Sequence, residues 1–167
     1  MAIEPNWTDI VAAVGAFGVV ILGVITFWFY RKEHRLNGLV QAFKILNDSK
    51  HRDAREMVYS GFEIYTKNKD SKIFIDSKQA KESTETVRAD FDQMGALLRN
   101  GTIQKQGFMQ AYGETAYRCW NALRDHIKEE RKQRNFVHYM ENFEWLSDEA
   151  IKFWQKKGVN LTSIVRY

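Results

Sequence analysis

Near its N-terminus the chain carries one uninterrupted apolar run. Residues 10–30 (IVAAVGAFGVVILGVITFWFY) contain no charged side chain, and all 25 Lys and Arg residues lie after them. At about 1.5 Å per residue a helix of this length reaches about 31 Å, close to the roughly 30 Å hydrocarbon thickness of a bilayer. The pattern therefore predicts a transmembrane helix over residues 10–30, preceded by a short extracytoplasmic segment, residues 1–9.

After this run, apolar residues recur at the spacing of one face of an α-helix. The recurrence predicts further helices over residues 36–46, 49–65, 78–99, 105–134 and 136–154. We expect Ser49 to cap the second of them. We also expect Asn37 and Gly38 to form a hinge. Asn100 and Gly101 should end the helix over residues 78–99, because both residue types adopt a left-handed backbone at low cost.

The polar, Lys-rich residues 66–77 are the one place where we expect loop or a short extended piece. No alternation typical of a β-strand is convincing elsewhere, so the predicted fold class is all-α. We predict a basic juxtamembrane segment, residues 31–35, then a cytosolic four- or five-helix antiparallel bundle over residues 36–157. Residues 158–167 form the predicted C-terminal tail.

Charges that flank the apolar run predict its direction. Arg31, Lys32 and Arg35 follow it, and no Lys or Arg precedes it, so the positive-inside rule places the N-terminus outside and residues 31–167 in the cytoplasm. A cleaved signal peptide is the competing interpretation, but it would carry a basic segment before a shorter apolar stretch. We therefore predict a single-pass protein of the cell membrane. Its expected interfacial anchors are Trp7, Trp28, Tyr30, Arg31, Lys32 and Arg35.

Composition and charge add the expected partners. With 44% hydrophobic and 28% charged residues the chain has a globular balance. Residues 31–167 hold 25 basic and 19 acidic residues, a net charge of +6. This mild excess suits an anionic inner leaflet and falls short of a nucleic-acid-binding surface. We expect the bilayer and a protein as partners, and no nucleic acid; a single cysteine, Cys119, fits the cytoplasm.

Small residues line one side of the apolar run. They recur at helical spacing, whereas larger side chains occupy the other sides. Close backbone approach drives helix association in lipid, so we predict a membrane packing seam, with chance composition as the alternative. The seam consists of Ala12, Ala16, Val19, Gly23 and Thr26.

Two adjoining segments carry a family resemblance. Residues 87–103 read VRADFDQMGALLRNGTI, and the helix after them has the pattern F...YGE...R.W..L...I..ER, formed by Phe108, Tyr112, Gly113, Glu114, Arg118, Trp120, Leu123, Ile127, Glu130 and Arg131. Over about residues 54–154 the chain resembles an uncharacterised family of short membrane-anchored helical proteins, a domain of unknown function. The resemblance implies a helical fold and brings no activity, cofactor or catalytic residue.

Candidate chemistry is sparse. Asp90 and Asp92 are two positions apart, so on a helix they point about 200° apart and cannot act as an acid pair. We predict that Asp92 is solvated and that Asp90 forms a structural ion pair with Arg118 on the next helix; the alternatives are solvated residues or a functional carboxylate. Cys119 and His126 are separated by about 10.5 Å along a helix axis, too far for a nucleophile and its base. No metal-ligand spacing or catalytic motif is present, so we expect no metal or cofactor.

The densest charge run covers residues 128–134. It mixes signs, with Glu130 four positions before Arg134, and we interpret it as a solvated helix end rather than a lipid- or RNA-contacting patch. His126 stands four before Glu130, a spacing that fits a helical ion pair at least as well as half of a metal site, and no other histidine is spaced to complete such a site.

Glycines inside predicted helices indicate close contacts. Each costs about 1 kcal/mol relative to Ala, and we expect close helix crossings, or alternatively a ligand slot, at Gly61, Gly95 and Gly113. The leading functional prediction is a membrane-anchored protein-interaction module that acts as an oligomer or as an accessory subunit of a larger membrane complex. The alternative is a small-ligand sensor or enzyme with an inter-helix pocket near Asp90, Tyr112 and His126.

Overall fold

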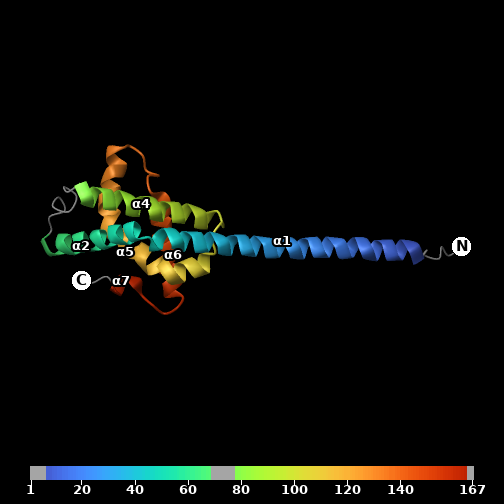
Figure 1. Cartoon of the computed structure of the whole chain (residues 1–167). Helices are drawn as coiled ribbons and strands as arrows, with labels where there is room; N and C mark the ends of the chain where they lie inside the picture. The colour runs from blue at the N-terminus through green and yellow to red at the C-terminus, as the bar shows by residue number, and fades with distance from the viewer. Residues whose placement is uncertain (1–6, 69–77, 165–167) are drawn as a thin grey trace.

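The computed structural model describes residues 7–68 and 78–164, and every regular element in these ranges is an α-helix (Figure 1). The all-α prediction is confirmed. The helices are α1 (Trp7–Asn47), α2 (Ser49–Asn68), α4 (Lys78–Arg99), α5 (Lys105–Gln133), α6 (Glu141–Gln155) and α7 (Leu161–Ile164). The expectations for residues 1–6, for most of the polar segment (69–77) and for residues 165–167 lie outside the described residues.

A single long helix, α1, replaces two predicted elements, so the expected hinge at Asn37 and Gly38 is wrong. Gly38 lacks a side chain for another reason, because a Cβ there would lie 2.7 Å from the carbonyl oxygen of Thr102. The turn between α4 and α5 thus lies directly against α1. The backbone N–H of Gln104 also donates a hydrogen bond to the carbonyl of Arg35, at 3.3 Å.

A single residue separates α1 from α2. Asp48, not Ser49, caps α2, since the N–H of Lys50 donates to Asp48 Oδ1 and the N–H of Arg52 to the Asp48 carbonyl, both at 3.0 Å. So short a break does not reverse the chain, and α2 continues away from the apolar end of α1 (Figure 1). α4 runs back beside α2, and α5 runs away again, so these three helices alternate in direction as the bundle prediction expects (Figure 1).

The end of α4 is the one the sequence predicted. Gly101 has a φ of +69°, and its N–H donates to the carbonyl of Leu98 at 3.1 Å. The N–H of Thr102 donates to the carbonyl of Leu97 at 3.0 Å. These two bonds form the Schellman arrangement, which satisfies the last carbonyls of a helix with glycine in the left-handed position.

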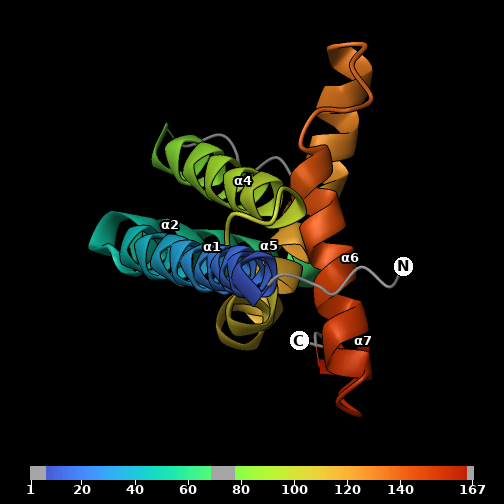
Figure 2. The same cartoon turned by 90° about the vertical axis from the view of Figure 1, so that its right-hand side faces the viewer.

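The core is built where α6 packs across α4 and against α5 (Figure 2). Phe143 of α6 stacks on Phe91 of α4 with ring centroids 5.3 Å apart and meets Trp120 of α5 edge-on at 5.2 Å. α6 begins at Glu141, five residues later than expected. Met140 before it has a left-handed backbone, with φ of 56°, which interrupts a helix. Leu161 of α7 is buried in the same core, so part of the predicted tail belongs to the folded domain.

Candidate functional site

The first half of α1 projects beyond the other described helices (Figure 1). It is long and apolar enough to cross a membrane, and its apolar window has no buried residue. All five seam residues are exposed, and nothing lies within 4 Å of the position that a Cβ on Gly23 would take. The predicted anchors Trp7, Trp28 and Tyr30 are exposed as well. An exposed apolar surface of this size is typical of membrane or protein contact sites.

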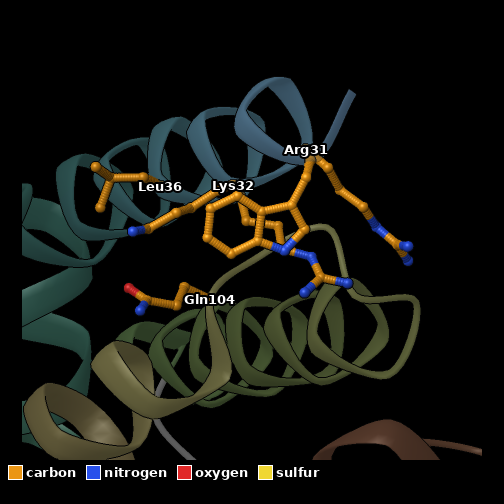
Figure 3. Close-up of a pocket in the computed structure, with 6 residues that line it drawn as sticks. Arg31, Lys32, Leu36 and Gln104 are labelled. Atoms are coloured by element: carbon orange, nitrogen blue, oxygen red, sulfur yellow. The ribbon is translucent and has the colours of Figure 1, made fainter. Parts of the chain in front are cut away.

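Where α1 reaches the bundle, a recess of about 240 Å³ opens beside it. Its lining consists of Trp28, Arg31, Lys32, Arg35 and Leu36 of α1, with Gln104 of the α4–α5 turn. Figure 3 shows Gln104 facing Lys32 and Leu36 across the recess, while Arg31 extends on the other side. The Lys32 ammonium lies over the Trp28 ring, 5.5 Å from its centroid. The sequence predicted the α1 residues other than Leu36 as interfacial anchors; it gave no signal that Gln104 would join them.

The predicted partner of Asp90 was wrong. His51 of α2 occupies that place, with its Nδ1 2.6 Å from Asp90 Oδ2. Arg118 instead lies over the ring of Tyr59, 4.5 Å from the centroid, and 4.0 Å from Glu114. Burial raises the pKa of Asp90, although the hydrogen bond and charge of His51 act in the opposite direction.

The expectation that Asp92 is solvated was also wrong. Its Oδ1 accepts hydrogen bonds from the backbone N–H groups of Asn142 and Phe143, each at 3.0 Å. These are the second and third residues of α6, whose preceding residue, Met140, makes no side-chain cap. A carboxylate on α4 therefore caps α6 from another helix.

Glycine positions mark how closely these helices approach. A Cβ on Gly95 would collide with the backbone of Asn142, and one on Gly113 would lie 3.2 Å from Trp154 Nε1. α6 thus crosses α4 at Gly95 and α5 at Gly113, with no room for a ligand slot at Gly95. Gly61 is buried on α2, and its close crossing stays a prediction.

Part of the predicted solvated charge run is covered. Arg88 of α4, only 5% exposed in its side chain, reaches Glu130 at 2.8 Å, and His126 lies 3.3 Å from the same carboxylate. Burial would raise the pKa of Glu130, but Arg88, Tyr139 and His126 together outweigh burial, and the pKa falls. Arg131 donates to the Tyr139 carbonyl at 2.8 Å. These contacts attach the end of α5 to α4 and to the segment before α6.

The cysteine has no nucleophilic character. Cys119 is fully buried on α5, and its Sγ donates a weak hydrogen bond to the Tyr59 hydroxyl at 3.5 Å. Burial raises the pKa of the thiol to about 12, so it stays protonated at neutral pH. No cluster of three His, Cys, Asp or Glu side chains that could hold a metal ion occurs in residues 7–68 and 78–164.

Comparison with known protein families gives a match. A family model described as Domain of unknown function (DUF4760) covers residues 10–150, which include the apolar half of α1. Neither the search of curated proteins nor that of solved structures finds a match.

Proposed function

We propose a function for this chain, which belongs to the family described as Domain of unknown function (DUF4760). The proposal starts from α1, one half of which is exposed while the other half is buried against the bundle. The protein is a single-pass membrane protein with its N-terminus outside and its helical domain in the cytoplasm. That domain binds protein partners, either as an oligomer of this chain or as an accessory subunit of a larger membrane complex. The bilayer, with its anionic inner leaflet, covers the apolar half of α1.

The two halves of α1 carry this proposal. Leu39, Ala42 and Leu46 are buried against the bundle, whereas side chains such as Phe17, 72% exposed, meet nothing in the described chain. A cleaved signal sequence passes the same test of length and composition. The family match begins at residue 10 and so includes the apolar run, which supports a retained helix.

Apolar surface outside the predicted bilayer supports a protein partner. Leu36 and Val40, 51% and 56% exposed, are one turn apart on the same face of α1. Phe136 and Val137 are exposed in the connection between α5 and α6. We take these two pairs of exposed apolar side chains as candidate contact points for a protein partner.

Native mass determination of the full chain, extracted from its own membrane in mild detergent, tests the proposal. We expect a particle heavier than one chain, either a homo-oligomer or a complex with other subunits. A strictly monomeric particle free of other proteins would contradict it. Protease treatment of sealed, right-side-out cells checks the orientation, since residues 31–167 should be protected until the membrane is opened.

A matched pair of variants tests whether the seam makes the contact. Gly23→Ile places a β-branched side chain where a neighbouring backbone would approach, and we expect it to reduce cross-linked oligomer or complex in membranes. Val24→Ile, one position round the helix, should leave the yield unchanged. Both keep the run apolar, so insertion should survive in each. Equal yields would show that association resides in the cytoplasmic domain.

The alternative of a ligand sensor or enzyme receives no support from the three side chains on which it rested. Asp90 is bonded to His51, the Tyr112 hydroxyl donates to Asn47 Oδ1 at 2.6 Å, and His126 lies beside Glu130. Each has its own partner, so they do not converge on one site.

A further inference from the structure

The recess beside α1 has the lining of an anion site. Of its six lining residues three are cations, one is an amide and two are apolar, and none is a carboxylate. Arg31, Lys32 and Arg35 all come from little more than one turn of α1, so their charges repel one another unless an anion lies among them.

Arg35 is the member that the fold holds in place. Its carbonyl accepts the Gln104 N–H, and its Nη2 lies 3.4 Å from the position a Cβ would take on Gly101. Its Nε is buried and has no hydrogen-bond partner among the described residues. A buried donor without an acceptor is costly. Two oxygens of a phosphate group can accept two parallel hydrogen bonds from a guanidinium.

The start of α5 adds positive potential on the opposite wall. Gln104, which lines the recess, is the N-cap of α5, makes no side-chain cap, and no acidic residue stands in the first turn. No acidic side chain in the first turn of α5 therefore neutralises the partial positive charge of this helix end. A helix N-terminus and three basic side chains then face one small volume.

The position along α1 selects the kind of anion. Trp28 belongs to the aromatic cluster that closes the apolar run, and Arg31 begins the charged part, so the recess falls at headgroup depth if α1 spans the bilayer. Trp28 supplies apolar contact for the glycerol and upper acyl region, which a free phosphate does not need. We propose that this recess binds the phosphate of an anionic phospholipid of the inner leaflet. The proposal rests on the membrane insertion proposed above.

The first test compares two variants of equal charge in the full chain. Native mass spectrometry in mild detergent would follow titration with phosphatidylglycerol. We expect Arg35→Gln to weaken lipid binding about tenfold, as for the loss of a charge-assisted hydrogen bond. Lys44→Gln removes a charge from an exposed position on the same helix, away from the recess, and should change binding less than twofold. Equal weakening of lipid binding by the two variants would show that binding depends only on general surface charge, and would overturn the proposal.

A second pair covers the case in which Arg35→Gln does not fold, judged by circular dichroism. Arg31→Gln with Lys32→Gln changes two exposed lining residues, and Lys44→Gln with Lys156→Gln is the matched control outside the recess. We again expect only the lining pair to weaken binding about tenfold. Equal weakening by both pairs would overturn the proposal.

Further measurements distinguish a lipid phosphate from free phosphate, and this inference from the proposed function. Inorganic phosphate, present in excess, should not displace phosphatidylglycerol, and phosphatidylcholine, which carries no net charge, should bind more weakly. Displacement by inorganic phosphate, or equal binding of the two lipids, would overturn the lipid assignment. Carbonate extraction of membranes tests insertion separately. If the chain resists extraction but its lipid binding does not depend on the recess residues, this inference alone is refuted. If carbonate extracts the chain, the proposed function is refuted.

Discussion

The cap that α4 provides to α6 can be tested with one side chain. Asp92→Ala removes the carboxylate that accepts the N–H groups of Asn142 and Phe143 at 3.0 Å. Both groups lie in the first turn of α6, where no carbonyl of the same helix is available to them. Met140, the residue before the helix, makes no side-chain cap. The variant therefore leaves two donors without the acceptor that the fold supplies.

The expected cost follows from these contacts. Loss of an N-terminal cap costs about 1 kcal/mol, with a range of roughly 0.5 to 2. Loss of a negative charge at a helix N-terminus adds about 0.3 to 1 kcal/mol. We therefore expect Asp92→Ala to lower the free energy of unfolding by about 2 kcal/mol. Asp92→Asn keeps a neutral acceptor and should lose only the charge contribution, about 0.5 kcal/mol.

Urea unfolding of the full chain in mild detergent, followed by circular dichroism, measures this difference, and hydrogen exchange locates it. Protection should fall in the first turn of α6, residues 141–144, before it falls elsewhere. Asp125→Ala is the control, because that carboxylate is 70% exposed and lies 3.7 Å from Arg124; such surface changes cost less than about 0.5 kcal/mol. Equal effects of the two Ala variants, or a uniform loss of protection, would refute the cross-helix cap.

Three further predictions follow from buried groups. Gly95→Ala should lower the midpoint of thermal unfolding, although Ala favours a helix by about 1 kcal/mol, because its Cβ would lie 2.7 Å from the carbonyl carbon of Asn142; a raised midpoint would show that the crossing can open. Cys119, with its pKa raised to about 12 by burial, should react with iodoacetamide only as fast as the protein opens; rapid labelling of the native protein would contradict this. Burial raises the pKa of Asp90 despite His51, so its contribution to stability is full below the ordinary pKa and is lost as pH rises through the folded pKa. Asp90→Asn should remove this loss, measured by urea unfolding across the acidic range, and an unchanged pH profile would refute the assignment.

Local patterns in the sequence determined most of the helices. The apolar spacing of α4 and α5 gave their limits to within a residue, because each helix buries one continuous face along its length. Asn100 and Gly101 gave the end of α4, since the left-handed backbone needed there is a property of those residue types. The 21 uncharged residues predicted the exposed apolar half of α1, because the length of an apolar run can be read from the sequence without knowing which segments pack beside it.

Contacts between helices depended on where other segments lie. The partner of Asp90 is His51 because a one-residue break at Asp48 sends α2 onward rather than back, which brings α2 and not Arg118 to that carboxylate. Asp92 caps α6 only because the close crossing at Gly95 brings a helix end within reach of it. Neither partner is at a spacing that a single helix would reveal.

The recess beside α1 combines residues that the sequence predicted with residues that only the tertiary structure brought to them. The sequence determined its aromatic and basic residues and their place at the end of the apolar run. Only the tertiary structure brought Gln104 and the start of α5 against them, through the close approach of the α4–α5 turn to Gly38. The reason is that one helix sets the spacing of its own charges, whereas a recess needs a second wall, and its position depends on how the whole core packs.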